Sequence, residues 1–469
     1  MRTVTAALAF AAAVGLAAAG APPVIPSAPP IHAASQYTKH VRSVSGGSLS
    51  AVAVPGATAY KLVHLHGSTH QRGLAYGSLL ADDIVSLVDK MDDFYKSEVT
   101  GIPWAKLGLP KWLESALENT LADAAPTIFE TALGWVFDKQ HPHLLASRVQ
   151  PLAEIKGISE GICSTLKTPC NATTWELKLQ KLNMLPELIR MTCSMIGAHG
   201  SATADGKLLQ LRTLDFGGGP FANHTVLAVH HPTGAEGVPF AAISFSGLVG
   251  VVTGFSQHIA MSEKVWETYR SPDVQPGTYS GMPVVMIIRE MLQFSKSKAE
   301  AIAIATHAQR TWAVLLGVGD AETMQFNALG YKEKSLAVYD DANMSSVTNA
   351  ADPPAGASGK GGNAAPIKDI VYIDRHPQPS TDPTLHKLLQ GYHGKLTAEM
   401  IAQNVPRLTH SGDVHTMTVD FEKKDVLIQI GSIGPGDEGY GPGDEGYAAY
   451  QPISRWTSAL WTDSHQLEL

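Results

Sequence analysis

A cysteine, an arginine and an aspartate stand close enough along this chain to form a site for nucleophilic chemistry. Cys193 is followed by Arg212 and then by Asp215. Between them, Asp205-Gly206 predicts a tight turn, because this dipeptide readily adopts positive φ angles. Short apolar runs flank the turn and predict two paired strands. Such a hairpin would place a cation and a carboxylate beside the thiol, which suits an activated nucleophile.

The N-terminus has the pattern of a secretory signal peptide. Arg2 precedes an apolar run over 4–16 and a series of small residues up to Ala21, which predicts a signal over 1–21. No later run approaches the ~18–20 apolar residues that a bilayer crossing requires. We therefore expect a protein without a transmembrane segment that is secreted or resides in the lysosomal or endosomal lumen.

The cysteines and the glycosylation motifs agree with export. Three Asn-x-Ser/Thr triplets predict glycans at Asn171, Asn223 and Asn343. Among the three cysteines, a disulfide between Cys163 and Cys170 would leave Cys193 as the odd thiol. An unpaired thiol in an oxidising compartment is the pattern expected of a nucleophile.

Composition limits the class of partner. With 469 residues, 44% hydrophobic and 17% charged, the chain is typical of globular proteins. The formal net charge of −8 argues against nucleic acid or an anionic membrane as the main partner. The 19 histidines would bring the chain nearer to neutrality in an acidic compartment.

The order of sequence patterns predicts one domain with irregular additions. Residues 22–47 are rich in proline, alanine and serine and are expected to be poorly ordered. A largely helical part over 48–192 precedes a strand-rich part over 193–469. The second part contains a flexible Gly-rich insert over 350–366 and a tandem heptad over 434–447, which predicts a surface loop.

The stretch from Cys193 to Asp215 resembles the N-terminal-nucleophile (Ntn) hydrolases of the acid ceramidase and choloylglycine hydrolase type, and is similar to the acid-ceramidase-like secreted proteins of amoebae. The runs 154–161 and 371–380 add to the resemblance. It implies an α+β fold, the αββα four-layer sandwich. It also implies self-cleavage between Thr192 and Cys193, with 48–192 as α subunit and 193–469 as β subunit, which stay associated.

The resemblance implies a role for each residue of the site. Cys193 would supply a thiol nucleophile and, after cleavage, an α-amino base whose reference pKa of ~7.7–8.0 lies near neutrality. Arg212 would lower the pKa of the thiol, and Asp215 would hold the α-ammonium. Related hydrolases also carry an asparagine that stabilises the oxyanion and a second arginine. Asn349 is the candidate donor, and no clean Asn-Arg pair stands around 372–386.

The implied reaction is hydrolysis of a non-peptide amide without a cofactor. N-acylated lipids such as ceramides or N-acylethanolamines are the leading substrate class. Because the asparagine and the second arginine are not matched, a bile-acid-like, penicillin-like or lactone substrate stays open.

Three other functions remain open. His64, His66 and His70 give the His-x-His pattern of zinc amidohydrolases, but no distant carboxylate accompanies them, so we expect no metal. A papain-like thiol hydrolase would need a helix that begins at Cys193. A non-catalytic secreted glycoprotein on a degenerate Ntn scaffold is the third alternative.

Overall fold

The computed structural model describes most of the chain, namely residues 28–99, 102–120, 122–167, 169–189, 192–216, 219–266, 277–344, 366–378, 380, 382–432 and 446–466. The predicted signal peptide, Asn349, the Gly-rich insert up to residue 365 and the tandem loop up to residue 445 lie outside these residues.

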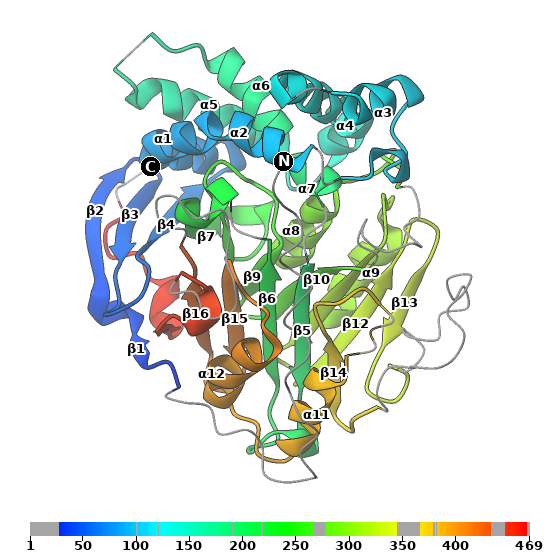
Figure 1. The fold of residues 1–469 in the computed structure, drawn as a ribbon. Coiled ribbons are helices and arrows are strands. Elements are labelled where there is room, and N and C mark those ends of the chain that lie inside the picture. Colours follow the sequence, from blue (N-terminus) through cyan, green and yellow to red (C-terminus); the bar gives the residue numbers. More distant parts are fainter. Residues whose placement is uncertain are drawn as a thin grey trace.

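Within the described residues, the strands form one sheet of seven strands and one of ten, which together occupy the middle of Figure 1. In sheet order, the seven strands are β1 (Ile31–Ala33), β17 (Ile453–Trp456), β16 (Asp425–Ile430), β15 (His415–Asp420), β6 (Leu209–Asp215), β5 (Thr192–Ala198) and β14 (Ile370–Ile373). The ten are β13 (Leu336–Tyr339), β12 (Gln325–Tyr331), β11 (Val314–Asp320), β10 (Ile259–Val265), β9 (Thr253–Ser256), β8 (Phe240–Phe245), β7 (Thr225–Pro232), β4 (Tyr60–Gly67), β3 (Gly47–Val52) and β2 (Thr38–Val44).

The helices fall into three groups along the chain. The first group gathers at one end of the molecule, at the top of Figure 1, and contains α1 (Thr69–Asp89), α2 (Met91–Glu98), α3 (Lys111–Glu118), α4 (Ala125–Ala146), α5 (Pro151–Thr165), α6 (Ala172–Leu182) and α7 (Leu185–Leu188). The others are α8 (Val284–Phe294) with α9 (Lys298–His307), and α11 (Thr384–Gly391) with α12 (Ala398–Thr409). Among the described residues, no helix combines the length and apolar character that a membrane crossing demands.

Alternation along β5 shows how the sheets and helices pack. Met195 belongs to a buried apolar cluster that joins residues of both sheets, including Phe326 of β12. Its neighbour Ile196 points the other way, into a cluster with α11 and α12 that includes Ile401. A third cluster joins the ten-stranded sheet to α1, α5 and α8. Because successive side chains of a strand point to opposite faces, β5 is buried on both sides, as its apolar sequence requires. The fold is thus mixed, with two sheets and helices.

Glycines allow α1 and α5 to pack with their backbones in contact. A Cβ added at Gly73 or Gly77 would overlap the carbonyl oxygen of Glu154 or Ile158, respectively. The glycines of α5 lie equally close to the backbone of α1. The glycines within these two helices therefore mark a close helix–helix contact.

The segment 22–47 was expected to be poorly ordered, and its described part corrects this expectation. Residues 31–44 contain two strands, β1 and β2. β1 pairs in parallel with β17, and β2 pairs with β3. The prediction was wrong here because the partner of β1 lies at the far end of the sequence, where local composition gives no signal.

Candidate active site

Cys193 lies at the second position of β5 and is wholly buried. The chain at this point is a strand, so the helix that a papain-like thiol site would need is absent. The hairpin prediction placed strands on both sides of Asp205-Gly206, and β5 and β6 pair as antiparallel neighbours across it. Cys193 pairs with Leu214 and Met195 pairs with Arg212. Arg212 and Cys193 therefore share one face of the sheet.

The Arg212 guanidinium contacts the thiol directly. Its Nη2 lies 3.2 Å from Cys193 Sγ, and its side chain is fully buried. A buried cation at this distance favours the thiolate over the thiol. Cys193 and Arg212, expected from the sequence to lie together, are thus in contact.

The carboxylate of Glu263, which was not expected from the sequence, also contacts the thiol and the guanidinium. Glu263 of β10 lies with its Oε2 3.9 Å from Cys193 Sγ and 3.6 Å from Arg212 Nη2. Burial raises the pKa of Glu263 to about 7, although the charge of Arg212 opposes this shift. At neutral pH the group is therefore close to half ionised, the condition in which a carboxylate serves well as a general base.

The thiol itself is held in its protonated form. Burial raises the pKa of Cys193, and the charges of Arg212 and Lys264 only partly oppose this. Lys264 is also wholly buried, and its Nζ donates to the carbonyls of Val265 (3.2 Å) and Arg375 (3.3 Å). Burial lowers the pKa of Lys264. Thiolate formation here requires a base that removes the proton and cations that stabilise the charge.

His415 orients the arginine. Its Nε2 lies 3.2 Å from Arg212 Nη1, which can only donate, and 2.9 Å from Thr253 Oγ1. An imidazole that accepts at Nε2 carries its proton on Nδ1. Burial and the neighbouring Arg212 charge lower the pKa of His415 well below its usual range. The neutral ring therefore acts as an acceptor that fixes the guanidinium against the thiol.

Asp215 lies on the other face of the seven-stranded sheet, opposite Thr192. Its carboxylate accepts from Ser411 Oγ and from the Gly412 backbone N–H, both at 2.5 Å. Ser411 in turn contacts Ser194 at 2.9 Å. Burial raises the pKa of Asp215. The structure thus puts this carboxylate beside the backbone that precedes Cys193, whereas the thiol has Glu263.

The predicted glycosylation sites lie at the surface of the described residues. The three sequon asparagines, Asn171, Asn223 and Asn343, are exposed. Asn171 also caps α6, because its Oδ1 accepts from the Thr174 N–H at 3.1 Å. Cys163 and Cys170 form a disulfide, and Cys193 is the free thiol. Asn349 lies outside the described residues, so its distance from Cys193 is undefined.

Two histidines of the metal alternative, His64 and His66, both contact His231. His64 Nδ1 lies 3.0 Å from His231 Nε2, and the ring of His66 stacks on that of His231. His70 instead contacts Glu160 at 2.9 Å. Within the described ranges, no three histidine, cysteine, aspartate or glutamate side chains are arranged to hold a metal ion.

Three residues of the site were missed by sequence reasoning, namely Glu263, Lys264 and His415. Glu263 and Lys264 interrupt an otherwise apolar strand, and two adjacent charges in such a run are a usable signal, since charged residues are almost never fully buried unless paired. His415 carries no comparable signal, because its role depends on the pairing of β15 with β6.

Two curated proteins of Dictyostelium discoideum are similar to this chain. It is 31% identical to Protein dcd1A over 394 residues, covering 81% of this chain and 80% of that protein. It is 30% identical to Protein dcd1B over 376 residues, covering 79% and 68%. The chain belongs to the dcd1 protein family. The names of these dcd1 relatives state no activity, and no protein-family model matches the chain.

Two solved structures show weaker likeness to this dcd1 family member. One is a Caenorhabditis elegans N-acylethanolamine-hydrolyzing acid amidase ortholog, with a TM-score of 0.34, 13% identity and coverage of 56% of this chain and 99% of that chain. The other is penicillin V acylase from Agrobacterium tumefaciens, with a TM-score of 0.30, 11% identity and coverage of 52% and 84%. Likeness at this level does not establish a shared fold.

Proposed function

We propose that this chain is the precursor of an N-terminal cysteine hydrolase that cleaves itself between Thr192 and Cys193 and then hydrolyses a non-peptide amide. The observation that carries the proposal is the buried contact of Cys193 Sγ with Arg212 Nη2 at 3.2 Å and Glu263 Oε2 at 3.9 Å. Two features support the αββα order of an Ntn hydrolase: apolar side chains of the two sheets pack on each other, and each sheet also packs on helices.

Self-cleavage follows from the chemistry of these groups. Glu263 takes the thiol proton, and Sγ attacks the carbonyl carbon of Thr192 to form a carbon–sulfur bond. The peptide C–N bond breaks, and the Cys193 nitrogen takes the proton and becomes an α-amine. Water then hydrolyses the thioester, which releases the Thr192 carboxylate and restores the thiol. Arg212 stabilises the thiolate at the start and the end.

After the cut, the new amine is the N-terminus of Cys193. It lies next to Thr192, the residue that pairs with Asp215. A charge-assisted hydrogen bond to this carboxylate would hold the amine in place. The amine then takes the thiol proton, Sγ attacks the carbonyl carbon of an amide substrate, and the protonated amine donates to the leaving nitrogen. Water resolves the acyl thioester and frees the acid product.

The test of self-cleavage is the intact mass of the secreted protein. Scaling by residue number, we expect fragments of about 18 and 29 kDa before glycans from residues 22–192 and 193–469. Cys193→Ala should remain one chain. The matched control is Cys163→Ala/Cys170→Ala, which removes the other two cysteines and should still be cut. Cleavage of Cys193→Ala at the same bond would assign the cut to a host protease.

We propose N-acylated lipids, of the ceramide or N-acylethanolamine kind, as the substrate class. Phe245, whose ring lies 6.5 Å from that of His415, lines a small apolar cavity together with Leu248, Val252 and Val285. At about 20 Å³ this cavity admits no acyl chain, so the binding of a lipid depends on movement after cleavage. Phe255 packs between the two sheets and does not line this cavity.

A panel of fluorogenic N-acyl amides on the cleaved protein, at pH 4.5 and 7.5, tests the substrate. Turnover should rise with acyl-chain length. Turnover of short or polar amides, with none of the long-chain ones, would overturn the lipid assignment and keep the amidase.

Passage through the secretory route, toward the outside of the cell or the lysosome, belongs to the same proposal. The exposed sequon asparagines and the disulfide support it. Removal of N-glycans by an endoglycosidase should lower the mass of the secreted protein. An unchanged mass would contradict the glycoprotein assignment.

A further inference from the structure

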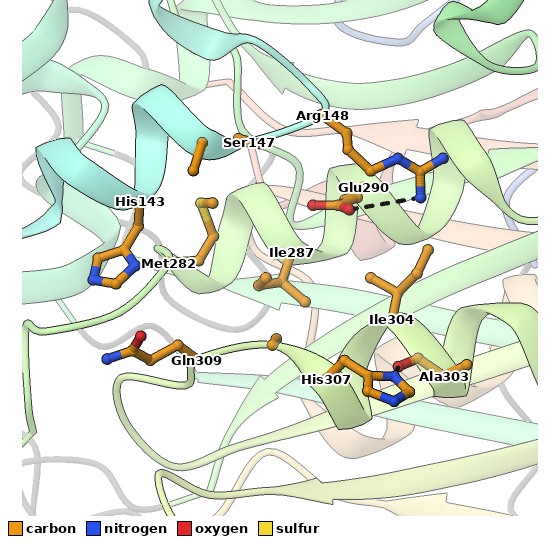
Figure 2. Close-up of a pocket in the computed structure, with 12 residues that line it drawn as sticks. His143, Ser147, Arg148, Met282, Ile287, Glu290, Ala303, Ile304, His307 and Gln309 are labelled. Atoms are coloured by element: carbon orange, nitrogen blue, oxygen red, sulfur yellow. Dashed lines mark hydrogen bonds and ion pairs between the residues drawn. The ribbon is translucent and has the colours of Figure 1, made fainter.

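A cavity of about 460 Å³ lies away from Cys193, between the end of α4, α8 and α9. Figure 2 shows side chains from all three elements converging on it. None of the residues that contact Cys193 lines it. Its volume falls in the range of small-molecule sites, ~300–1,000 Å³.

The floor of the cavity is apolar. Met282, Ile287 and Ile304 line it, and Ile287 is almost fully buried. A ligand that covers these side chains would remove apolar surface from water, which is favourable at roughly 25 cal/mol per Å².

One acidic side chain points into this apolar space. The Glu290 side chain is only 15% exposed, and its sole polar contact among the described residues is a 4.0 Å approach to Arg148. Arg148 is 60% exposed and stacks on Phe294, 4.1 Å from the ring centroid. Burial raises the pKa of Glu290, and the charge of Arg148 only partly opposes this. The carboxylate is thus largely removed from water without a hydrogen-bond donor.

Beside the Arg148 guanidinium, the lining adds two acceptors and no further acid. His307 lies within reach of the Ala303 carbonyl through Nδ1, at 2.7 Å, so its Nε2 remains an acceptor. Gln309 donates from Nε2 to the Ser280 carbonyl, which leaves its Oε1 as an acceptor. A ligand that supplies N–H donors would meet acceptors both at the floor and at the rim.

We propose that this cavity is a binding site for an amphiphilic amine, with the ammonium on Glu290 and the alkyl chain on Met282, Ile287 and Ile304. An ammonium supplies both the charge and the donors that Glu290 lacks, and charge-assisted hydrogen bonds of this kind are the strong ones. An anionic ligand would be repelled by the same carboxylate. A neutral alcohol would bring one donor and no charge. The site does not depend on the proposed function.

Calorimetric titration of the full chain with octylammonium at pH 7 tests the site. We expect saturable binding, with Glu290→Gln weakening it by about tenfold or more, since loss of one partner of a buried charged pair is costly. The matched control is Glu118→Gln, an exposed carboxylate at the end of α3 outside the cavity, which should bind as the parent does. Octanol and octanoate should bind at least tenfold more weakly than the amine.

A second variant tests the position. Ala303 is exposed on α9 at the cavity wall, so Ala303→Trp should fill the cavity without disturbing the core and abolish binding while the thermal unfolding temperature stays unchanged. Absence of binding to the parent chain, equal binding by Glu290→Gln, equal binding of octanol, or retained binding by a folded Ala303→Trp would each overturn the proposal.

Discussion

At the scale of single residues, Arg212 is both a chemical group and a structural one. It is fully buried between the thiol of Cys193, the carboxylate of Glu263 and the ring of His415. The sequence alone predicts that Arg212→Ala loses activity with folding retained, because its spacing across the Asp205-Gly206 turn places the arginine beside the thiol. The observed burial changes this expectation, since a buried charge that loses its partner is strongly destabilising.

Arg212→Ala should therefore lower the free energy of unfolding by about 3 kcal/mol or more, as expected when one partner of a buried ion pair is removed. Glu263→Gln in the same chain should restore part of the loss, because it removes the carboxylate left without a cation. Urea unfolding of the single and double variants measures both. Stability of Arg212→Ala equal to that of the parent would show that solvent reaches the site.

The same residues show how far local sequence can reach. Cys193 and Arg212 could be paired in advance, because a turn between adjacent strands fixes their register. Glu263 and His415 come from β10 and β15, which meet Cys193 and Arg212 only through sheet packing and strand pairing across long stretches of chain. Neither periodicity nor turn chemistry encodes such contacts, so these two residues could not be placed.

At the scale of elements, the contact of α1 with α5 depends on glycine. Glycine costs a helix roughly 0.5–1 kcal/mol relative to alanine, so its presence at the contact indicates a packing need. Gly77 lies where any Cβ would overlap the Ile158 carbonyl. Gly134, within α4, has only the end of the Lys181 side chain near its Cβ position, at 3.9 Å.

We expect Gly77→Ala to lower the free energy of unfolding by at least the ~1–3 kcal/mol that is typical of an overpacked core. The cost is high because the backbone of α1 or α5 must move to make room for the Cβ. Gly134→Ala is the matched control and should be neutral or stabilising by up to about 1 kcal/mol. Thermal unfolding of both variants decides. Equal effects would mean that α1 and α5 can separate freely.

Helices with a clear apolar face are predictable, as α8 shows: the apolar pattern over 283–294 predicts a helix, and the structure has one at Val284–Phe294. The strands β1 and β2 were not, because the segment before them is rich in proline and alanine and β1 takes its pairing from β17. Sequence periodicity thus predicts helices whose own residues form a continuous apolar face. It failed where a short strand is defined by a distant partner.

At the scale of the whole molecule, residues before Thr192 contribute strands to both sheets. β1 pairs with β17, and β4 pairs in parallel with β7. We therefore expect the fragments of a cut chain to elute together in size-exclusion chromatography and to separate only in denaturant. Separation under native conditions would contradict the observed pairing.

The buried histidines make acid a stress on the fold. Burial lowers the pKa of His64 to about 4 and that of His231 to about 3, whereas the unfolded chain has ~6.5. Below pH ~6.5 these histidines bind protons in the unfolded state but not in the folded state. The free energy of unfolding therefore falls as the pH drops toward 4, by on the order of 2–3 kcal/mol for His64. Glu263, with its raised pKa, acts in the opposite direction.

A comparison of variants isolates the histidine effect from that of Glu263. His64→Asn/His231→Asn should lose less stability between pH 7 and pH 4.5 than the parent chain. His70→Asn, which changes a half-exposed histidine paired with Glu160, should follow the parent. Unfolding temperatures at the two pH values provide the test, and parallel slopes for all three proteins would contradict it.

The parallel pairing of β4 with β7 has a consequence for the life of the molecule. These two strands lie on opposite sides of the Thr192–Cys193 bond, so a covalent chain brings them together while it folds. If the proposed cleavage breaks that bond, the two strands can find each other after unfolding only when two separate polypeptides meet in solution. The cleaved protein would then be kinetically stable, with a lifetime set by its unfolding rate. Its unfolding would be irreversible.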